Sequence, residues 1–172
     1  MKKKYWDRLH QFADRWWYAP LIGFVVAIDY YLLVIPNDAL VLAAAAFDPK
    51  KWLSIGICAG MGSSLGALSI AFLLDRYGMG ILLSHFPNLP QSHAWIFSVH
   101  FIDQYGSWAI WLIALGPFLQ HPMLALAVAD HMPLAKLFLF IVAGRLPKYM
   151  FYAFIAGRMP ELLKYLQRKK GE

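Results

Sequence analysis

Apolar residues gather in four stretches along the chain, and the first of these is broken near its middle. It covers residues 19–47 and is interrupted by Pro36, Asn37 and Asp38. Proline lacks a backbone donor and disfavours helix in the residue before it, so a helix should end there. The second stretch, residues 52–74, has no such break. It is long enough to cross a bilayer, which takes about 20 apolar residues in a helix.

The second half of the chain repeats this pattern. An apolar stretch over residues 108–129 is broken between Gly116 and Pro122, a segment that also contains Pro117, and an unbroken run over residues 134–155 follows. Corresponding breaks in two halves of a membrane protein point to an inverted repeat with a site near the middle of the bilayer. We therefore predict an all-α, polytopic membrane protein with two re-entrant hairpins, each followed by a crossing helix. The halves share no sequence identity, so the repeat rests on architecture alone.

Small residues in the second stretch favour close helix packing. Gly62 and Gly66 are expected to let a neighbouring backbone approach, because packing drives helix association in lipid. The adjacent Ser63 and Ser64 are best explained by the same packing. Between the two halves, residues 75–107 are mixed in character and predict an amphipathic helix on the membrane surface.

The two ends of the chain differ from its apolar centre. Residues 1–18 mix charged and aromatic residues at near-helical spacing, which favours an amphipathic segment in the membrane interface. Residues 19–157 form the predicted transmembrane domain, and residues 158–172 form a basic cytoplasmic tail. A cleavable signal is disfavoured because charged and aromatic residues separate the first lysines from the first apolar run.

Composition supports a membrane protein and argues against several other classes. Hydrophobic residues make up 60% of the chain and charged residues 15%, against about 45–50% and about 25% in soluble domains. The net charge is +6, but most bases lie at the two ends beside apolar runs. Anionic lipid headgroups, rather than nucleic acid, are therefore the expected partner.

Catalytic and metal chemistry leave no recognisable pattern in the sequence. The single cysteine, Cys58, lies inside an apolar run and fits no disulfide or zinc spacing. The histidines show no metal spacing either. No serine nucleophile motif, phosphate-binding loop or pair of catalytic carboxylates can be identified. We predict a protein that is not an enzyme and that needs no cofactor or metal.

The distribution of lysine and arginine predicts that both termini are cytoplasmic. If the broken stretches are hairpins, the bases of both ends share one side with Lys50 and Lys51, and the opposite face holds little beyond Arg76 and Lys136. Basic short loops mark the cytoplasmic side. A plain bundle of four spans would also keep both termini inside, but it would turn Lys50 and Lys51 outward.

Six ionisable residues, of which Asp130 is one, fall at membrane depth, where a charge costs at least about 2.5 kcal/mol. Asp38 follows the first break and could line a cavity or cap the next helix, and these roles are compatible. Arg145 and Lys148 lie about one turn apart on one helix face. They could bind a phosphate or counter the acids of the first half, or they could snorkel to the interface. Asp29 is expected to pair with a base, and His121 could carry protons or serve only as a hydrogen-bonded polar residue.

The breaks and the residues around them resemble the DedA/VTT superfamily, also called SNARE-associated Golgi proteins, and in particular its small YqaA-like members. The likeness covers about residues 25–157. Pro36-Asn37-Asp38 matches a proline shortly before an acid in the first hairpin of that family. The glycine-rich segment from Gly60 to Gly66 matches the start of its next helix. Gly144-Arg145-Leu146-Pro147-Lys148-Tyr149 looks like its late Gly-Lys-x-x-Arg-Tyr pattern with the bases exchanged.

The resemblance departs from the family at two places. The acid that follows the family glycine matching Gly66 is replaced here by Ala67. The second hairpin, from Gly116 to Pro122, lacks the arginines that the family carries there. A proton-coupled mechanism cannot rest on those groups in this chain.

By resemblance, the chain is expected to be a flippase or scramblase that moves a phosphate-bearing lipid, such as undecaprenyl phosphate, between leaflets of a bacterial inner membrane. The headgroup would meet Arg145 and Lys148, while Asp38 would bind a proton or cation or hold the arginine of an empty site. Two alternatives remain: a proton- or ion-coupled transporter of small solutes, and a membrane scaffold without transport. A chain of 172 residues leaves only a small pathway unless it forms a homodimer.

Overall fold

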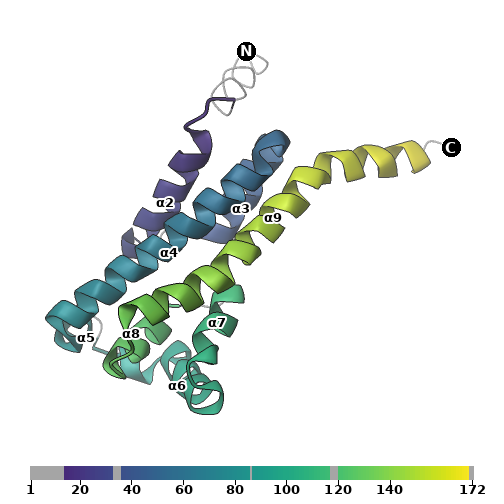
Figure 1. Cartoon of the computed structure of the whole chain (residues 1–172). Helices are drawn as coiled ribbons and strands as arrows, with labels where there is room; N and C mark the ends of the chain where they lie inside the picture. Colours follow the sequence, from purple (N-terminus) through teal and green to yellow (C-terminus); the bar gives the residue numbers. More distant parts are fainter. Residues whose placement is uncertain (1–13, 33–35, 86, 117–119, 171–172) are drawn as a thin grey trace.

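The computed structural model of the chain consists of helices joined by short turns in the residues that it describes, which are 14–32, 36–85, 87–116 and 120–170 (Figure 1). The predicted all-α class is confirmed. Most of the amphipathic segment predicted at residues 1–18 lies outside these ranges, as does Pro117 of the second break. The helices in chain order are α2 (Tyr18–Leu32), α3 (Asn37–Phe47), η1 (Pro49–Lys51), α4 (Trp52–Tyr77), α5 (Met79–His85), η2 (Leu89–Gln91), α6 (His93–Tyr105), α7 (Trp108–Leu115), α8 (His121–Ala129) and α9 (Leu134–Lys170).

Two long helices form the frame of the molecule. The segments Pro49–Tyr77, which includes α4, and Leu134–Met159, within α9, are long and apolar enough to cross a membrane. They contain the two runs that the sequence predicts to cross. The helices pack against each other through small residues, and a Cβ atom on Gly60 would lie 3.0 Å from the Cα atom of Leu146. Helix α9 continues without interruption into the basic tail, and Pro147 does not end it.

Both broken stretches form pairs of short helices at the predicted breaks. Helix α2 ends at Leu32, and α3 begins directly after Pro36. Helix α7 ends before its C-cap Gly116, and α8 begins at His121 with Pro122 in its first turn. Proline is tolerated there because the first amides of a helix have no partner within the helix. Figure 1 shows that each pair reverses direction near the middle of the molecule.

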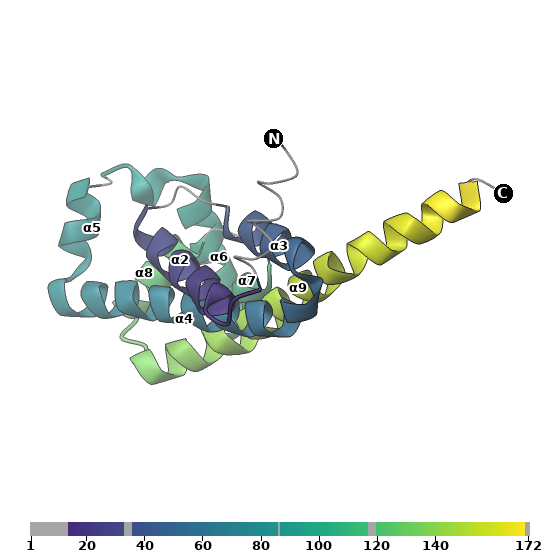
Figure 2. The ribbon, with the colours of Figure 1, turned by 90° about the horizontal axis from the view of Figure 1, so that it is seen from above.

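The two pairs pack on the long helices in the same manner. Helix α2 makes its most extensive contacts with α4, which follows it in its own half, and α3 packs mainly against α9 of the other half. In the second half, α7 packs mainly against α9, and α8 packs mainly against α4. Viewed from above, both pairs lie on one side of the layer formed by α4 and α9 (Figure 2).

Glycines bring these helices into close contact. A Cβ atom on Gly62 would overlap the backbone of Gly23 in α2, and one on Gly66 would lie 2.7 Å from the carbonyl oxygen of Ala27. In the second half, a Cβ atom on Gly144 would lie 2.9 Å from the carbonyl oxygen of Trp111 in α7. Any larger side chain at these positions would push the helices apart.

Candidate functional site at the helix breaks

Buried and partly buried polar side chains form a layer at the level where both apolar stretches are broken. Ser63 lies at the midpoint of the 29-residue segment Pro49–Tyr77, and Arg145 lies near the middle of the 26-residue segment Leu134–Met159. Two apolar clusters lie on either side of this level along both long helices. We call the polar layer the break cluster and define it by five residues: Asp38, Ser63, Gln120, Arg145 and Lys148.

Lys148 connects the two breaks. Its Nζ atom lies 2.9 Å from Oδ1 of Asp38, in the first turn of α3, and donates a hydrogen bond of 3.0 Å to the carbonyl oxygen of Gly116, at the end of α7. The lysine side chain is 7% exposed, whereas the Asp38 side chain is 33% exposed. The lysine of this ion pair is therefore buried, whereas the aspartate is accessible to a ligand.

Arg145 joins α9 to α4 and to the start of α8. Its Nε atom donates to Oε1 of Gln120 at 2.9 Å, and Nη2 donates to the same oxygen. Nη1 donates to the hydroxyl of Ser63 and, at 3.2 Å, to the hydroxyl of Tyr149. Arg145 is 7% exposed, so these bonds replace water almost completely. Among the described residues, the oxygens that accept from Arg145 are all neutral.

Tyrosine rings surround the two cations. The guanidinium carbon of Arg145 lies 5.1 Å from the ring centre of Tyr30 and 5.9 Å from that of Tyr149. The Lys148 ammonium lies 5.4 Å from the Tyr149 ring centre and 5.5 Å from that of Tyr152. Such contacts stabilise a desolvated cation without neutralising it, each by up to about 2 kcal/mol.

Further polar atoms lie beside the break cluster. The His121 Nε2 atom donates to the backbone carbonyl of Tyr30 at 3.1 Å. Within the described part of the chain, His121 Nδ1 and Asn37 Oδ1 are buried and have no hydrogen-bond partner. Asp29 is 4% exposed, and its carboxylate lies close enough to act electrostatically on the His121 ring. Asp29, Asp38 and His121 thus lie around the two breaks, as the sequence places them.

Three expectations about single residues need correction. Asp38 is not the N-cap of α3, because Pro36 holds that position and no side chain caps the helix. Asp38 pairs with Lys148, one of the two bases expected to counter the acids of the first half, and not with Arg145. Arg145 and Lys148 do not snorkel to the interface, because both are more than nine-tenths buried and bond to other helices.

The structure also brings in residues that sequence reasoning missed. Ser63, assigned to helix packing, accepts a hydrogen bond from Arg145, whereas Ser64 donates to the Gly60 carbonyl of its own helix. Gln120 and Tyr30 bond to each other at 3.1 Å although 90 residues separate them. The sequence feature that could have identified Gln120 is its position in the second break, directly before His121.

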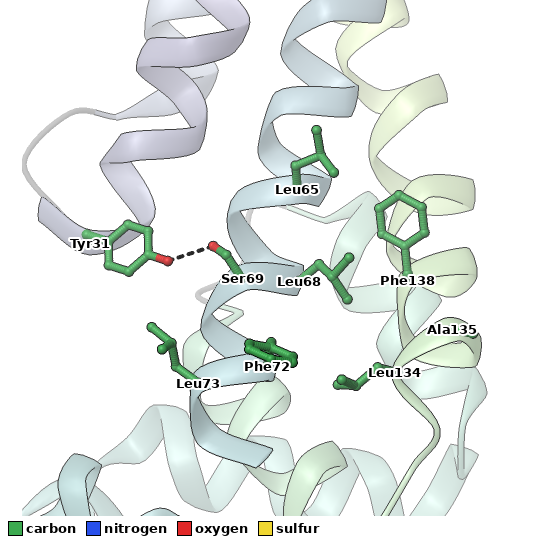
Figure 3. A pocket seen from close by; sticks show the side chains of 9 residues that line it. All are labelled: Tyr31, Leu65, Leu68, Ser69, Phe72, Leu73, Leu134, Ala135 and Phe138. Atoms are coloured by element: carbon green, nitrogen blue, oxygen red, sulfur yellow. Dashed lines mark hydrogen bonds between the residues drawn. The ribbon is translucent and has the colours of Figure 1, made fainter. Parts of the chain in front are cut away.

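An apolar groove of about 590 Å³ lies apart from the break cluster, between α4 and α9 (Figure 3). Its polar side chains are Tyr31 and Ser69, whose hydroxyls point at each other and bond at 2.7 Å. The groove therefore offers hydrocarbon surface without a charged group. Its lining residues are Tyr31, Leu65, Leu68, Ser69, Phe72, Leu73, Leu134, Ala135 and Phe138.

The break cluster is suited to binding an anion. Arg145 and Lys148 are buried cations on one face of α9, and the carboxylate bonded to Lys148 is partly exposed. Charge-assisted bonds from arginine and lysine are the usual means of holding phosphate. In the described ranges, no group of three or more histidine, cysteine or acidic residues could hold a metal ion.

Comparison with known proteins adds no relative to this picture. No family model, no curated protein and no solved structure matches the chain. The resemblance to the DedA/VTT superfamily therefore stays a prediction that rests on the two breaks and on the residues from Gly144 to Tyr149.

Proposed function

We propose that the chain is an integral membrane protein that moves a phosphate-bearing lipid between leaflets along the break cluster. Two long apolar helices support the membrane location. Large apolar side chains are also exposed on several helices, including Phe24 on α2 (62%), Phe72 on α4 (56%) and Leu139 on α9 (67%). Exposure of this kind marks membrane or protein contacts, because a soluble surface rarely carries large apolar patches.

In this proposal the two helix pairs are re-entrant hairpins of an inverted repeat. In each pair, one short helix packs on the long helix of its own half, and the other short helix packs on the long helix of the other half. This exchange supports a two-fold relation between the halves. Both breaks contact Lys148, which lies within a crossing segment. Non-helical backbone at membrane depth is tolerated where it is buried in protein or lines a cavity.

The observation that carries the transport proposal is the pair of buried cations at mid-depth. A charge there is costly, so embedded ionisable residues mark substrate or ion pathways by default. A phosphate headgroup would replace Asp38 as the partner of Lys148, and Asp38, which is partly exposed, would be released toward the headgroup's entry side. The acyl tails would stay in lipid throughout.

Family and location complete the proposal. The chain would be a small member of the DedA/VTT superfamily in a bacterial inner membrane, with both termini cytoplasmic. Lys50 and Lys51, which follow the first hairpin in η1, would share the cytoplasmic side with the basic tail. Positive loops favour that side.

Leaflet exchange of fluorescent lipids in liposomes tests the transport function. Purified protein should accelerate exchange of a phospholipid or an undecaprenyl-phosphate analogue, and Asp38→Asn and Arg145→Gln should abolish the acceleration. Asp103→Asn and Arg158→Gln make the same changes at exposed positions and should exchange lipid normally. No exchange above that of empty liposomes, with the helical fold verified, would reject the proposal.

A proton-coupled solute transporter is the second candidate. His121 favours it, because this residue lies in the second break and its Nδ1 atom is buried without a hydrogen-bond partner among the described residues. Histidine changes its charge near physiological pH. Proton flux into liposomes that disappears in His121→Gln, without any lipid exchange, would favour this candidate. Absence of both activities would leave a scaffold role.

A further inference from the structure

Gln120 occupies a position where an acid would be expected. Its single Oε1 atom accepts from Arg145 Nε at 2.9 Å, from Arg145 Nη2, and from the Tyr30 hydroxyl at 3.1 Å. Gln120 is 4% exposed, so water contributes almost no hydrogen bonds to its side chain. Two guanidinium donors in a buried site are ordinarily met by a carboxylate, which also neutralises the charge.

The amide orients Arg145 without neutralising it. Only the amide oxygen can face the guanidinium, because the amide nitrogen is a donor. A glutamate side chain has the same length and would place an oxygen at the same point, adding a negative charge next to Arg145. The other described acceptors, Ser63 and Tyr149, are neutral as well. The described hydrogen bonds of Arg145 thus include no acceptor that carries a negative charge.

We propose that Gln120 is a specificity-determining residue: it holds Arg145 in place while leaving its positive charge available to an anionic headgroup. This inference rests on the lipid pathway proposed above and adds the residue that sets its preference for anions. Arg145 and Lys148 both contact the Tyr149 ring, so an anion that displaces Asp38 from Lys148 enters the field of both cations.

Other charged groups lie around Gln120 and act at longer range. Asp38 pairs with Lys148, and Asp29 acts on the His121 ring. Neither carboxylate is among the described acceptors bonded to the guanidinium of Arg145. A new carboxylate at position 120 would therefore be the first in direct contact with it.

Binding of lipids to the purified full chain in detergent tests the inference. Native mass spectrometry would compare dioleoyl phosphatidic acid with dioleoylglycerol, which has the same tails and no phosphate. We expect Gln120→Glu to weaken binding of phosphatidic acid about tenfold or more, because it adds a negative charge within a few ångströms of Arg145. Gln91→Glu makes the same change at an exposed site and should bind like the wild type.

Gln120→Met separates a charge role from a merely structural one. Methionine loses the hydrogen bonds but keeps Arg145 charged, so this variant should bind phosphatidic acid better than Gln120→Glu does. A structural role requires the reverse order, because glutamate retains the hydrogen bonds and methionine does not. If Gln120→Glu does not fold, complete loss of binding in folded Gln120→Met overturns the inference, and binding that is weakened but retained supports it.

The outcomes also separate this inference from the proposed function. Selective binding that Gln120→Glu loses, without any leaflet exchange by the wild type, supports the inference and rejects the transport function. Exchange and binding that both persist in Gln120→Glu support transport and overturn the inference. Thermal stabilisation of the wild type by inorganic phosphate, with no binding of phosphatidic acid, would assign the site to a free anion and overturn the lipid identity.

Discussion

The ion pair between Asp38 and Lys148 should contribute measurably to stability because one of its partners is buried. Removing one member of a buried pair costs about 3–5 kcal/mol, since it leaves an uncompensated charge. The Asp38 side chain is 33% exposed, so water compensates part of that loss. We therefore expect Asp38→Asn to lower the free energy of unfolding by about 1–2 kcal/mol, between the values for exposed and buried pairs.

A double-mutant cycle isolates the pair from other effects of each substitution. Lys148→Met also loses the hydrogen bond to the Gly116 carbonyl, a contact that Asp38 does not share. The double variant should be less destabilised than the sum of the single ones, by a coupling energy of about 1 kcal/mol. Circular dichroism during unfolding in mixed micelles of dodecyl sulfate and dodecyl maltoside measures all four proteins.

Exposed substitutions control this experiment. Asp103→Asn and Lys50→Met make comparable charge changes at exposed positions outside the break cluster. They should change the unfolding free energy by less than about 0.5 kcal/mol. Additive losses in the cycle, with both controls neutral, would refute a direct interaction between Asp38 and Lys148.

Three further predictions follow from particular contacts. Gly62→Leu should destabilise the fold by about 1–3 kcal/mol or more, because a leucine side chain at this position would overlap the backbone of α2. Gly80→Ala places its methyl group in open space and should not lower stability in the same unfolding assay. Tyr30→Phe removes a donor to Gln120 and should cost about 0.5–1.5 kcal/mol; an unchanged unfolding curve would contradict the observed bond. In a background without the native cysteine, Lys50→Cys and Arg76→Cys, which lie at opposite ends of the crossing segment, should react with an impermeant maleimide from opposite sides of the membrane. Labelling from one side would reject the proposed topology.

Several members of the break cluster could be identified from sequence, but which acid pairs with which base could not. Asp38, Arg145 and Lys148 were noticeable because charges are rare in apolar runs. That Asp38 meets Lys148 depends on how α3 lies against α9, a contact between the two halves of the chain. Gln120 and Ser63 carry no charge, and polar residues of their kind are common in membrane helices, where they also serve helix packing.

Sequence by itself determined the all-helical class, the positions of both helix breaks and the two long apolar segments. These properties are local: the missing donor of Pro36 and the apolar character of a run act wherever the chain folds. Tertiary structure decided that Lys148 connects both breaks and that a neutral amide holds Arg145. Those contacts join residues 25 to 110 positions apart, and their geometry depends on how closely glycines let the helices approach.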